Sequence, residues 1–377
     1  MRLRVPRRLA PPIIGACALT LTGLTGVSAQ TTTDPWLIEF RQVTQDIHLA
    51  YRPVPLRYQV EGNVTLIFNE TDVVVVDGSG SPRAAREVIA YIREQSPHPV
   101  SHLINTHGHG DHTLGNQEYL LAFPNIEIVA RPETRDYITG EGYAPGRGID
   151  YVRQIAEDTS SRKQALGEEI HRLEAEAAPG FEAVVTNLRE YIEHDIDVRQ
   201  REYRTVKLTP PTMTIERRLT LHRPQRTIDI VYLGPGDTKG DLVVHLPSDG
   251  VVVTGDMVVH PIPYGFSRSP LEWAQTLDAL ALLKFDVLIP GHGAVQAGTA
   301  YLHQVRALLA SVQSQVRRGM AEDLDLERIR ATVNLEVERD QFAGQDPVLR
   351  YYFTEYFEKP NVSRTHGALT ANRSDGP

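Results

Sequence analysis

The chain has 377 residues, with 39 basic and 48 acidic side chains and a formal net charge of −9. This acidic balance argues against a protein that binds nucleic acid or anionic lipid through its charge. With 41% hydrophobic and 23% charged residues, the composition is that of a globular protein with a substantial buried core. The single cysteine, Cys17, excludes an intramolecular disulfide.

Residues 1–29 have the pattern of a secretory signal peptide. Four arginines precede a short apolar run, "IIGACALTLTGLTGV", and a small-residue cleavage site follows at Ala29. We therefore expect a periplasmic or secreted protein, and the alternative is a lipoprotein acylated at Cys17. Cleavage would leave no cysteine and 35 basic against 48 acidic side chains, a net charge of −13. No other segment is apolar enough for stable membrane insertion.

Residues 30–47 are expected to be irregular, and a single domain is predicted over residues 48–300. The runs "NVTLIFN" and "DVVVVDG" predict buried strands, the second of which ends at Asp77. Ser81 and Pro82 suit the N-cap and first position of the helix that follows. "VSHLINT" predicts another buried strand with a histidine-rich stretch at its carboxyl end, where layered α/β proteins bind ligands.

Residues 131–205 are predicted to form a helical insertion within this domain. Leu166, Ile170, Leu173 and Ala177 follow one another at intervals of four, three and four residues, which places them on one face of a helix. We interpret the insertion as amphipathic helices that cover the core. A substrate lid and a surface for homo-oligomer formation are the alternatives.

The second half of the domain repeats the order of strands and then helices. "RTIDIVYLG", "DLVVHLP", "GVVVTGD" and "FDVLIPGHG" predict strands, and Ser269 and Pro270 open a helix between the last two. A C-terminal helical extension is expected over residues 301–360. The polar tail of residues 361–377 is expected to be disordered.

The stretch "THGHGDH" places four metal-ligand side chains within six positions after a buried strand. His107 and His109 can present both imidazoles to one cation, and Asp111 and His112 can face a second cation nearby. Imidazole and carboxylate suit Zn²⁺, and also Fe or Mn. Two such cations can lower the pKa of a shared water and polarise a carbonyl or phosphoryl oxygen.

This stretch resembles the H-x-H-x-D-H signature of the metallo-β-lactamase-fold hydrolases. Four further segments resemble family segments in the same order: "VVVVDGSG", "GPGDTKGDLVVHLP", "VVVTGDMV" and "IPGHG". The resemblance covers about Leu49 to Val295. It implies an α+β fold, a four-layer αββα sandwich with metals at one edge, here with the helical insertion and the C-terminal helical extension added.

The resemblance also implies a role for each matching residue. The first metal would be held by His107, His109 and Asp237, and the second by Asp111, His112 and His292. Asp256 would bridge the two metals, and Asp111 would also act in catalysis. Asp77 would orient the histidine loop from behind, and the alternative for Asp77 is an aspartate that only shapes a turn at the end of a strand.

Asp237 departs from the family pattern, because most members have histidine at this position. With Asp111 and Asp256 it would place three carboxylates around two cations, which lowers their Lewis acidity and raises the pKa of bound water. It would also favour a harder cation at the first site. The alternative is that Asp237 only caps the turn and leaves the first site weak or empty.

The resemblance implies an exported hydrolase in which metal-bound hydroxide cleaves an acyl bond of a small molecule: an ester, thioester, lactone or lactam. We expect two Zn²⁺ ions, with Fe or Mn as alternatives, and no nucleic-acid partner. His260 and Tyr264 are candidate substrate contacts, because the loop after Asp256 lies near the metals in the family. The alternative functions are an envelope metal-binding or accessory protein with little hydrolase activity, and a β-lactamase proper.

Overall fold

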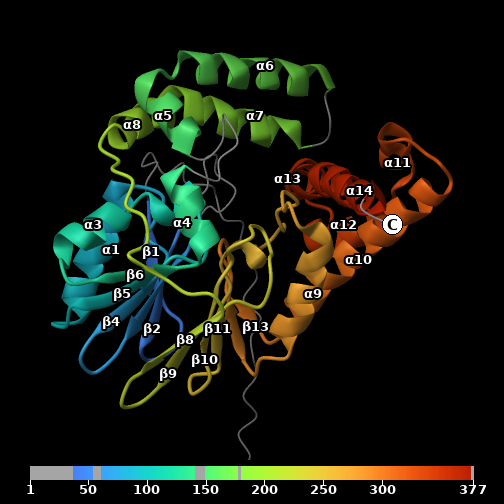
Figure 1. The fold of residues 1–377 in the computed structure, drawn as a ribbon. Helices are drawn as coiled ribbons and strands as arrows, with labels where there is room; N and C mark the ends of the chain where they lie inside the picture. Colours follow the sequence, from blue (N-terminus) through green and yellow to red (C-terminus); the bar gives the residue numbers. More distant parts are fainter. Residues whose placement is uncertain (1–36, 54–60, 141–148, 177–179, 375–377) are drawn as a thin grey trace, which may run out of the picture. The chain divides into compact units, whose positions relative to one another are not determined.

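The structure is a computed structural model and describes residues 37–53, 61–140, 149–176 and 180–374 (Figure 1). The predicted signal peptide lies outside the described residues. Within the described residues, no helix is both long enough and apolar enough to cross a membrane.

The first sheet contains seven strands, numbered in the order in which they lie side by side (Figure 1). Its first four strands pair antiparallel, and from β4 onward the pairs are parallel. The strands are β1 (Glu39–Gln42), β2 (Ile47–Tyr51), β3 (Val64–Phe68), β4 (Val73–Val76), β5 (Val100–Ile104), β6 (Glu127–Ala130) and β7 (Met213–Thr214).

The second sheet contains six strands in the order β13-β12-β11-β10-β9-β8. All of its pairs are antiparallel except the pair of β11 and β12. The strands are β8 (Arg218–His222), β9 (Thr227–Val231), β10 (Val243–Leu246), β11 (Val251–Val253), β12 (Val287–Ile289) and β13 (Gln296–Ala297).

The two sheets pack face to face through a shared apolar core. Ile67, Val74 and Ile104 of the first sheet belong to one buried cluster with Ile230 and Val244 of the second. Successive side chains of a strand point to opposite faces of the sheet, so every second side chain enters this core and the others lie on the outer face. Strands buried on both faces therefore have unbroken runs of valine, isoleucine and leucine.

Helices cover the outer face of each sheet. On the first sheet lie α1 (Pro82–Gln95) and α3 (Asn116–Ala122), and α1 begins where the Ser81 side chain accepts a hydrogen bond from the backbone N–H of Ala84. On the second lie α9 (Pro270–Ala281) and α10 (Ala300–Ala321). The predicted αββα sandwich is therefore confirmed.

Most of the described residues of 131–205 form helices. They are α4 (Pro132–Thr139), α5 (Ile149–Glu157), α6 (Ser160–Glu176), α7 (Phe181–Glu190), the π-helical turn η1 (Tyr191–Asp195) and α8 (Ile196–Tyr203). Leu166, Ile170 and Leu173 of α6 are buried in the same apolar cluster as the outer face of the second sheet and the C-terminal helices. Ala177 lies outside the described residues.

The C-terminal extension continues further than the sequence analysis predicts. After α10 it comprises α11 (Leu326–Thr332), α12 (Glu336–Ala343), α13 (Pro347–Tyr352), η3 (Phe353–Glu358) and α14 (Lys359–Ser374). The prediction of a disordered tail over 361–377 is therefore wrong for the residues within α14. Val362, Thr365 and Leu369 recur at three- and four-residue intervals and are buried. The segment therefore has a packed helix face, although its overall composition is polar.

The N-terminal segment also differs from the prediction. Residues 30–47 were expected to be irregular, yet β1 (Glu39–Gln42) pairs with β2. Three of the four residues of β1 are exposed. An edge strand of this kind has no alternation of apolar and polar residues from which it could be predicted.

We predict that the ion pair of Asp72 and Arg223 stabilises the fold at the start of β4. Arg223 Nε donates to Asp72 at 2.9 Å, and Ser101 Oγ also donates to this carboxylate. Burial raises the pKa of Asp72, but these donors outweigh it and hold the pKa below its ordinary value of 3.8. Asp72→Asn should therefore lower the free energy of unfolding at pH 7 by about 1–2 kcal/mol.

Chemical denaturation at several pH values measures this effect. A carboxyl whose pKa is lowered in the folded state stabilises the fold above its unfolded pKa, and this stabilisation is lost as the pH falls through the folded pKa. The difference between wild type and Asp72→Asn should thus shrink as the pH falls below about 3.8. Equal stabilities at pH 7 would contradict the prediction.

Candidate metal centre

The predicted ligand residues all follow strand ends at one edge of the sandwich. His107 and His109 lie in the loop after β5, and Asp111 and His112 lie in the short helix α2 (Gly110–Thr113) that follows. Three residues come from loops of the second sheet: Asp237 after β9, Asp256 in the 3₁₀ turn η2 (Gly255–Met257) after β11, and His292 after β12.

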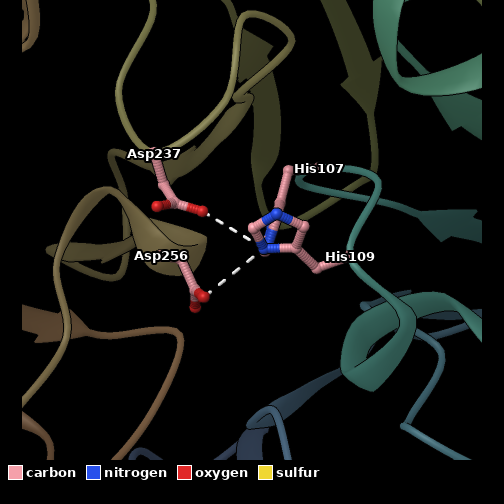
Figure 2. Close-up of side chains that lie close together, drawn as sticks. All are labelled: His107, His109, Asp237 and Asp256. Atoms are coloured by element: carbon pink, nitrogen blue, oxygen red, sulfur yellow. Dashed lines mark ion pairs between the residues drawn. The ribbon is translucent and has the colours of Figure 1, made fainter. Parts of the chain in front are cut away.

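One group of side chains comprises His107, His109, Asp237 and Asp256, whose ligand atoms all lie within 4.8 Å of one another (Figure 2). His109 Nδ1 lies 3.2 Å from Asp237 Oδ2, and His107 Nε2 lies 3.7 Å from Asp256 Oδ2. The structure thus brings Asp237 to the two histidines that the sequence analysis assigned to the first metal.

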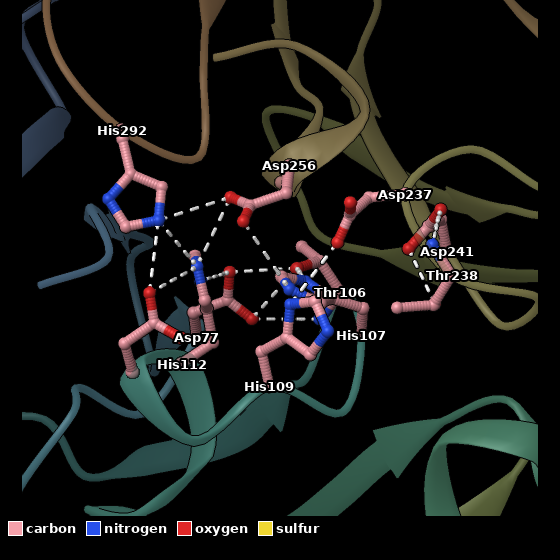
Figure 3. Close-up of polar contacts among 12 residues, drawn as sticks. Asp77, Thr106, His107, His109, His112, Asp237, Thr238, Asp241, Asp256 and His292 are labelled. Atoms are coloured by element: carbon pink, nitrogen blue, oxygen red, sulfur yellow. Dashed lines mark hydrogen bonds and ion pairs between the residues drawn. The ribbon is translucent and has the colours of Figure 1, made fainter. Parts of the chain in front are cut away.

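A second group comprises Asp111, His112, Asp256 and His292, again with ligand atoms within 4.8 Å of one another. His292 Nε2 lies 3.1 Å from Asp111 Oδ2 and 3.3 Å from Asp256 Oδ1. His112 Nε2 lies 3.2 Å from Asp256 Oδ1 (Figure 3). Asp256 therefore belongs to both groups, in the position of a bridging ligand.

The nitrogen and oxygen atoms of the two groups are better placed to bind divalent cations than to form hydrogen bonds with one another. The Nε2 atoms of His112 and His292 face each other at 3.2 Å, and at most one neutral ring of such a pair can donate a proton to the other. The buried atoms His107 Nε2 and Asp237 Oδ2 have no hydrogen-bond partner among the described residues. Buried polar atoms are rarely left in this state, and lone pairs that converge on one point are what a cation requires.

The charges of the site are strongly coupled. Burial raises the pKa of Asp256, but His292, His112 and His107 outweigh it and hold the pKa well below the ordinary range. Burial, followed by the charges of Asp256 and Asp111, raises the pKa of Asp237 well above the ordinary range. Without cations, the three clustered carboxylates, two of them buried, repel one another, so the site gains most from a ligand that carries positive charge.

Burial lowers the pKa of His107 well below 6.5, so this ring is neutral and can offer a lone pair. Burial also lowers the pKa of His292, but Asp256 and Asp111 outweigh it and raise the pKa to about 9. His292 therefore carries a proton that a cation has to displace, and metal binding should release protons.

Asp77 orients the second group from behind. It accepts a hydrogen bond from the backbone N–H of Thr106 at 2.8 Å, and its Oδ2 lies 2.9 Å from His112 Nδ1. This contact leaves His112 Nε2 facing the site, an arrangement typical of metal-ligating histidines. Asp77 has a φ of 67°, so the chain turns sharply at the end of β4 to place this carboxylate.

Asp241 shapes the loop that carries Asp237. Its Oδ2 accepts hydrogen bonds from the backbone N–H groups of Gly236 and Thr238, each at 2.9 Å, and its Oδ1 accepts one from Thr238 Oγ1 at 2.8 Å (Figure 3). Burial, followed by the charge of Asp237, raises the pKa of Asp241 to about 7. The segment "GDTKGD" thus folds around its second aspartate, a role that the sequence analysis did not assign.

Both candidate substrate contacts lie beside His292, where the His260 backbone N–H donates to the His292 carbonyl at 3.2 Å, but only the side chain of Tyr264 lies near a ligand side chain. The ring of Tyr264 lies 5.4 Å from that of His292, centroid to centroid. His260 instead packs against Tyr301 at 5.1 Å. It lines a cavity of about 280 Å³ among the strands β1 and β2 and the loop after His292, and none of the predicted metal ligands lines this cavity.

The sequence analysis also missed Asn63. Asn63 is buried. Its side-chain amide donates to the carbonyls of Pro290 at 2.9 Å and Gly293 at 3.0 Å, on either side of His292. No pattern within one strand predicts a hydrogen bond between residues more than 200 positions apart.

Comparison with known proteins agrees with this architecture. Residues 57–292 match the family model described as the metallo-beta-lactamase superfamily. The chain therefore belongs to this superfamily of metal-dependent hydrolases, and the predicted resemblance is confirmed. The fold implies binding of divalent cations.

Two relatives in these comparisons are alkylsulfatases. The linear primary-alkylsulfatase of Pseudomonas sp. (strain ATCC 19151) is 23% identical over 303 residues, which cover 74% of this chain and 51% of the relative. The structure of a stereoselective inverting sec-alkylsulfatase from Pseudomonas sp. aligns with a TM-score of 0.58 and 15% identity, over 90% of this chain and 52% of that chain. The chain thus spans about half the length of these relatives.

A metallo-beta-lactamase from Pontibacter korlensis aligns with a TM-score of 0.49 and 14% identity, over 73% of this chain and 99% of that one.

We predict that Asp237 is a ligand and not only a turn residue. Asp237→Ala should lower the metal content of the purified protein by about one equivalent, because the first group loses one of its two carboxylates. Asp237→His should restore the metal content, since imidazole is an equally competent ligand. Elemental analysis after dialysis against buffered Zn²⁺ measures both effects.

Asp136→Ala, on the surface helix α4, is a matched control that removes a carboxylate outside both groups. An Asp237→Ala protein with the metal content of wild type would contradict the role of Asp237. A His109→Ala protein with full metal content would contradict the whole ligand assignment.

Proposed function

We propose that this protein is a two-zinc hydrolase that cleaves an acyl ester bond of a small molecule. The observation that carries the proposal is the pair of ligand groups that share Asp256. Two cations held on one carboxylate lie close enough to act on the same bond. When bound, the cations would supply a Lewis acid for the substrate oxygen and lower the pKa of the attacking water.

Asp111 is suited to orient that water. Burial raises the pKa of Asp111, but His112 and His292 outweigh it and hold the pKa well below its ordinary value of 3.8, so the carboxylate is ionised. Its side chain is 24% exposed, whereas those of Asp237 and Asp256 are almost wholly buried. Asp111 is therefore the carboxylate that a water entering from solvent meets first, and it can accept a hydrogen bond from it.

The third carboxylate, Asp237, adapts the site to a particular range of substrates. It adds negative charge where most of the superfamily has a neutral imidazole, so the cations are weaker Lewis acids. The site should consequently favour esters with good leaving groups over amides. Compared with a histidine at this position, Asp237 also raises the affinity of the first group for cations harder than Zn²⁺, such as Mn²⁺.

An aromatic surface lies beside the second group. Tyr264 packs near His292, and Phe266 and Tyr356 follow at centroid distances of 6.3 and 6.4 Å from Tyr264. Phe266 is 41% exposed, which is unusual for a large apolar side chain so close to buried polar groups. This surface supports a substrate with an apolar group next to the ester.

Hydrolysis of an alkyl sulfate ester is a second candidate. It is favoured by the two alkylsulfatase relatives, one of which aligns over 90% of this chain. A sulfate ester would place an anionic group on the cations and its alkyl group on the aromatic surface. Both candidates use the same ligands, and they differ in the atom that is attacked.

A substrate panel tests the proposal. Metal-loaded wild type and Asp111→Asn would be assayed against acyl esters, thioesters, lactones, β-lactams and alkyl sulfates. We expect turnover of acyl esters by wild type and a loss of about 10²–10⁴ in kcat for Asp111→Asn assayed at saturating Zn²⁺. Asp136→Asn on α4 provides a control carboxylate outside the site.

The outcomes separate the candidates. Turnover of alkyl sulfates alone would identify sulfate esters, and not acyl esters, as the substrate class. Turnover of β-lactams alone would indicate a β-lactamase. A protein that binds two metals and turns over none of the panel would contradict the hydrolase proposal and favour an accessory metal-binding protein.

A further inference from the structure

A buried ion pair connects the helical insertion to the segment behind the metal ligands. Arg199 on α8 donates from Nη1 to Glu61 Oε1 at 2.8 Å, although the two residues are 138 positions apart. The Arg199 side chain is 0% exposed and that of Glu61 is 6% exposed. Such a pair is costly to bury unless the rest of the structure requires the two groups in this place.

Glu61 begins a short segment, Glu61–Asn63, that touches both loops of the second ligand group. The Gly62 backbone N–H donates to the carbonyl of Asp111 at 3.2 Å. A Cβ on Gly62 would come within 2.5 Å of the His112 ring, so the backbone lies directly against this imidazole. The position of Gly62 therefore fixes how far His112 can tilt away from the cation.

Asn63 holds the other loop. Its backbone N–H donates to the carbonyl of Gly291 at 2.7 Å, in addition to the two side-chain hydrogen bonds to Pro290 and Gly293. Three hydrogen bonds from one residue thus surround His292. The first ligand group is reached from this segment only through the shared Asp256, against whose Oδ1 Gly291 packs. Its other members, His107, His109 and Asp237, make no hydrogen bond to residues 61–63 within the described part of the chain.

Within the described part of the chain, the side chain of Glu61 accepts its hydrogen bond from Arg199. Its second oxygen, Oε2, is buried without a hydrogen-bond partner among the described residues. This oxygen lies against Gly80, where an added Cβ would come within 2.2 Å of Oε2 and 2.9 Å of the Asp111 Cα. Without Arg199, the unpaired carboxylate of Glu61 should move toward water. Gly62 and Asn63 follow Glu61 in the chain, so their contacts with the two ligand loops should shift with it.

We infer that Arg199 and Glu61 are positioning residues, through which the helical insertion sets the geometry of the second metal group more directly than that of the first. The inference rests on the proposed two-metal function. It assigns to the insertion a role in metal retention that differs from covering the core or closing over substrate.

The test is the metal stoichiometry of the full chain with Arg199→Met, in which the side chain keeps its approximate volume and loses its charge. Proteins would be dialysed against a series of buffered free Zn²⁺ concentrations and analysed for bound zinc. We expect Arg199→Met to bind the second zinc at least tenfold more weakly than wild type and to lose clearly less affinity for the first zinc. Arg199→Lys should recover part of the second affinity, because it restores the charge.

Two further variants keep the test decisive. Glu61→Gln removes the charge from the other partner and should also weaken the second zinc, so the inference can be tested even where Arg199→Met does not fold. Arg223→Met is the matched control, because it breaks an enclosed Arg–Asp pair at the opposite end of β4 from Asp77. It should lower stability and leave both zinc affinities unchanged.

The possible failures are distinguishable. Wild type that binds fewer than two zinc ions would contradict the proposed two-metal function itself. Wild type with two zinc ions and folded Arg199→Met or Glu61→Gln with both affinities unchanged would overturn the positioning role. Loss of both zinc ions in parallel, to the same degree as in Arg223→Met, would also overturn it, since the pair would then serve only stability.

Discussion

The carboxylate of Asp256 is the group on which both halves of the site depend. It lies within 3.7 Å of His107, 3.2 Å of His112 and 3.3 Å of His292, so it is the point at which the loops of the two sheets meet. Gly291 packs so closely that a Cβ would come within 2.0 Å of Asp256 Oδ1. A larger residue at position 291 would push the carboxylate out of place, which explains a glycine directly before His292.

Around this carboxylate, buried polar groups hold the ligand residues in place. Asp77 fixes the tautomer and direction of His112, Asp241 shapes the loop of Asp237, and Asn63 holds the loop of His292. Each supporting residue comes from a different loop of the sandwich. The rigid sheets thus act as a frame, and the chemistry depends on a few hydrogen bonds at one edge.

Much of this arrangement could be predicted from sequence, because the signals are local. Four ligand side chains in six positions identify the histidine loop, and unbroken runs such as "VVVVD" identify strands buried on both faces. The sharing of Asp256 and the presence of Asp237 at the site were implied by the resemblance to the metallo-β-lactamase-fold hydrolases. The contacts of Asn63 and the pair of Arg199 and Glu61 could not be predicted, since they join residues more than a hundred positions apart. The helix α14 was missed because its buried face includes Asn361 and Thr365, which look like tail residues.

The central claim is that two cations share Asp256 and that Asp237 binds one of them. Anomalous diffraction at the zinc edge from crystals of the metal-loaded protein tests it most directly. The account predicts two peaks with the Asp256 carboxylate between them and with the Asp237 carboxylate in contact with the peak on the side of His107 and His109. A single peak, or a first peak that Asp237 does not touch, would contradict it.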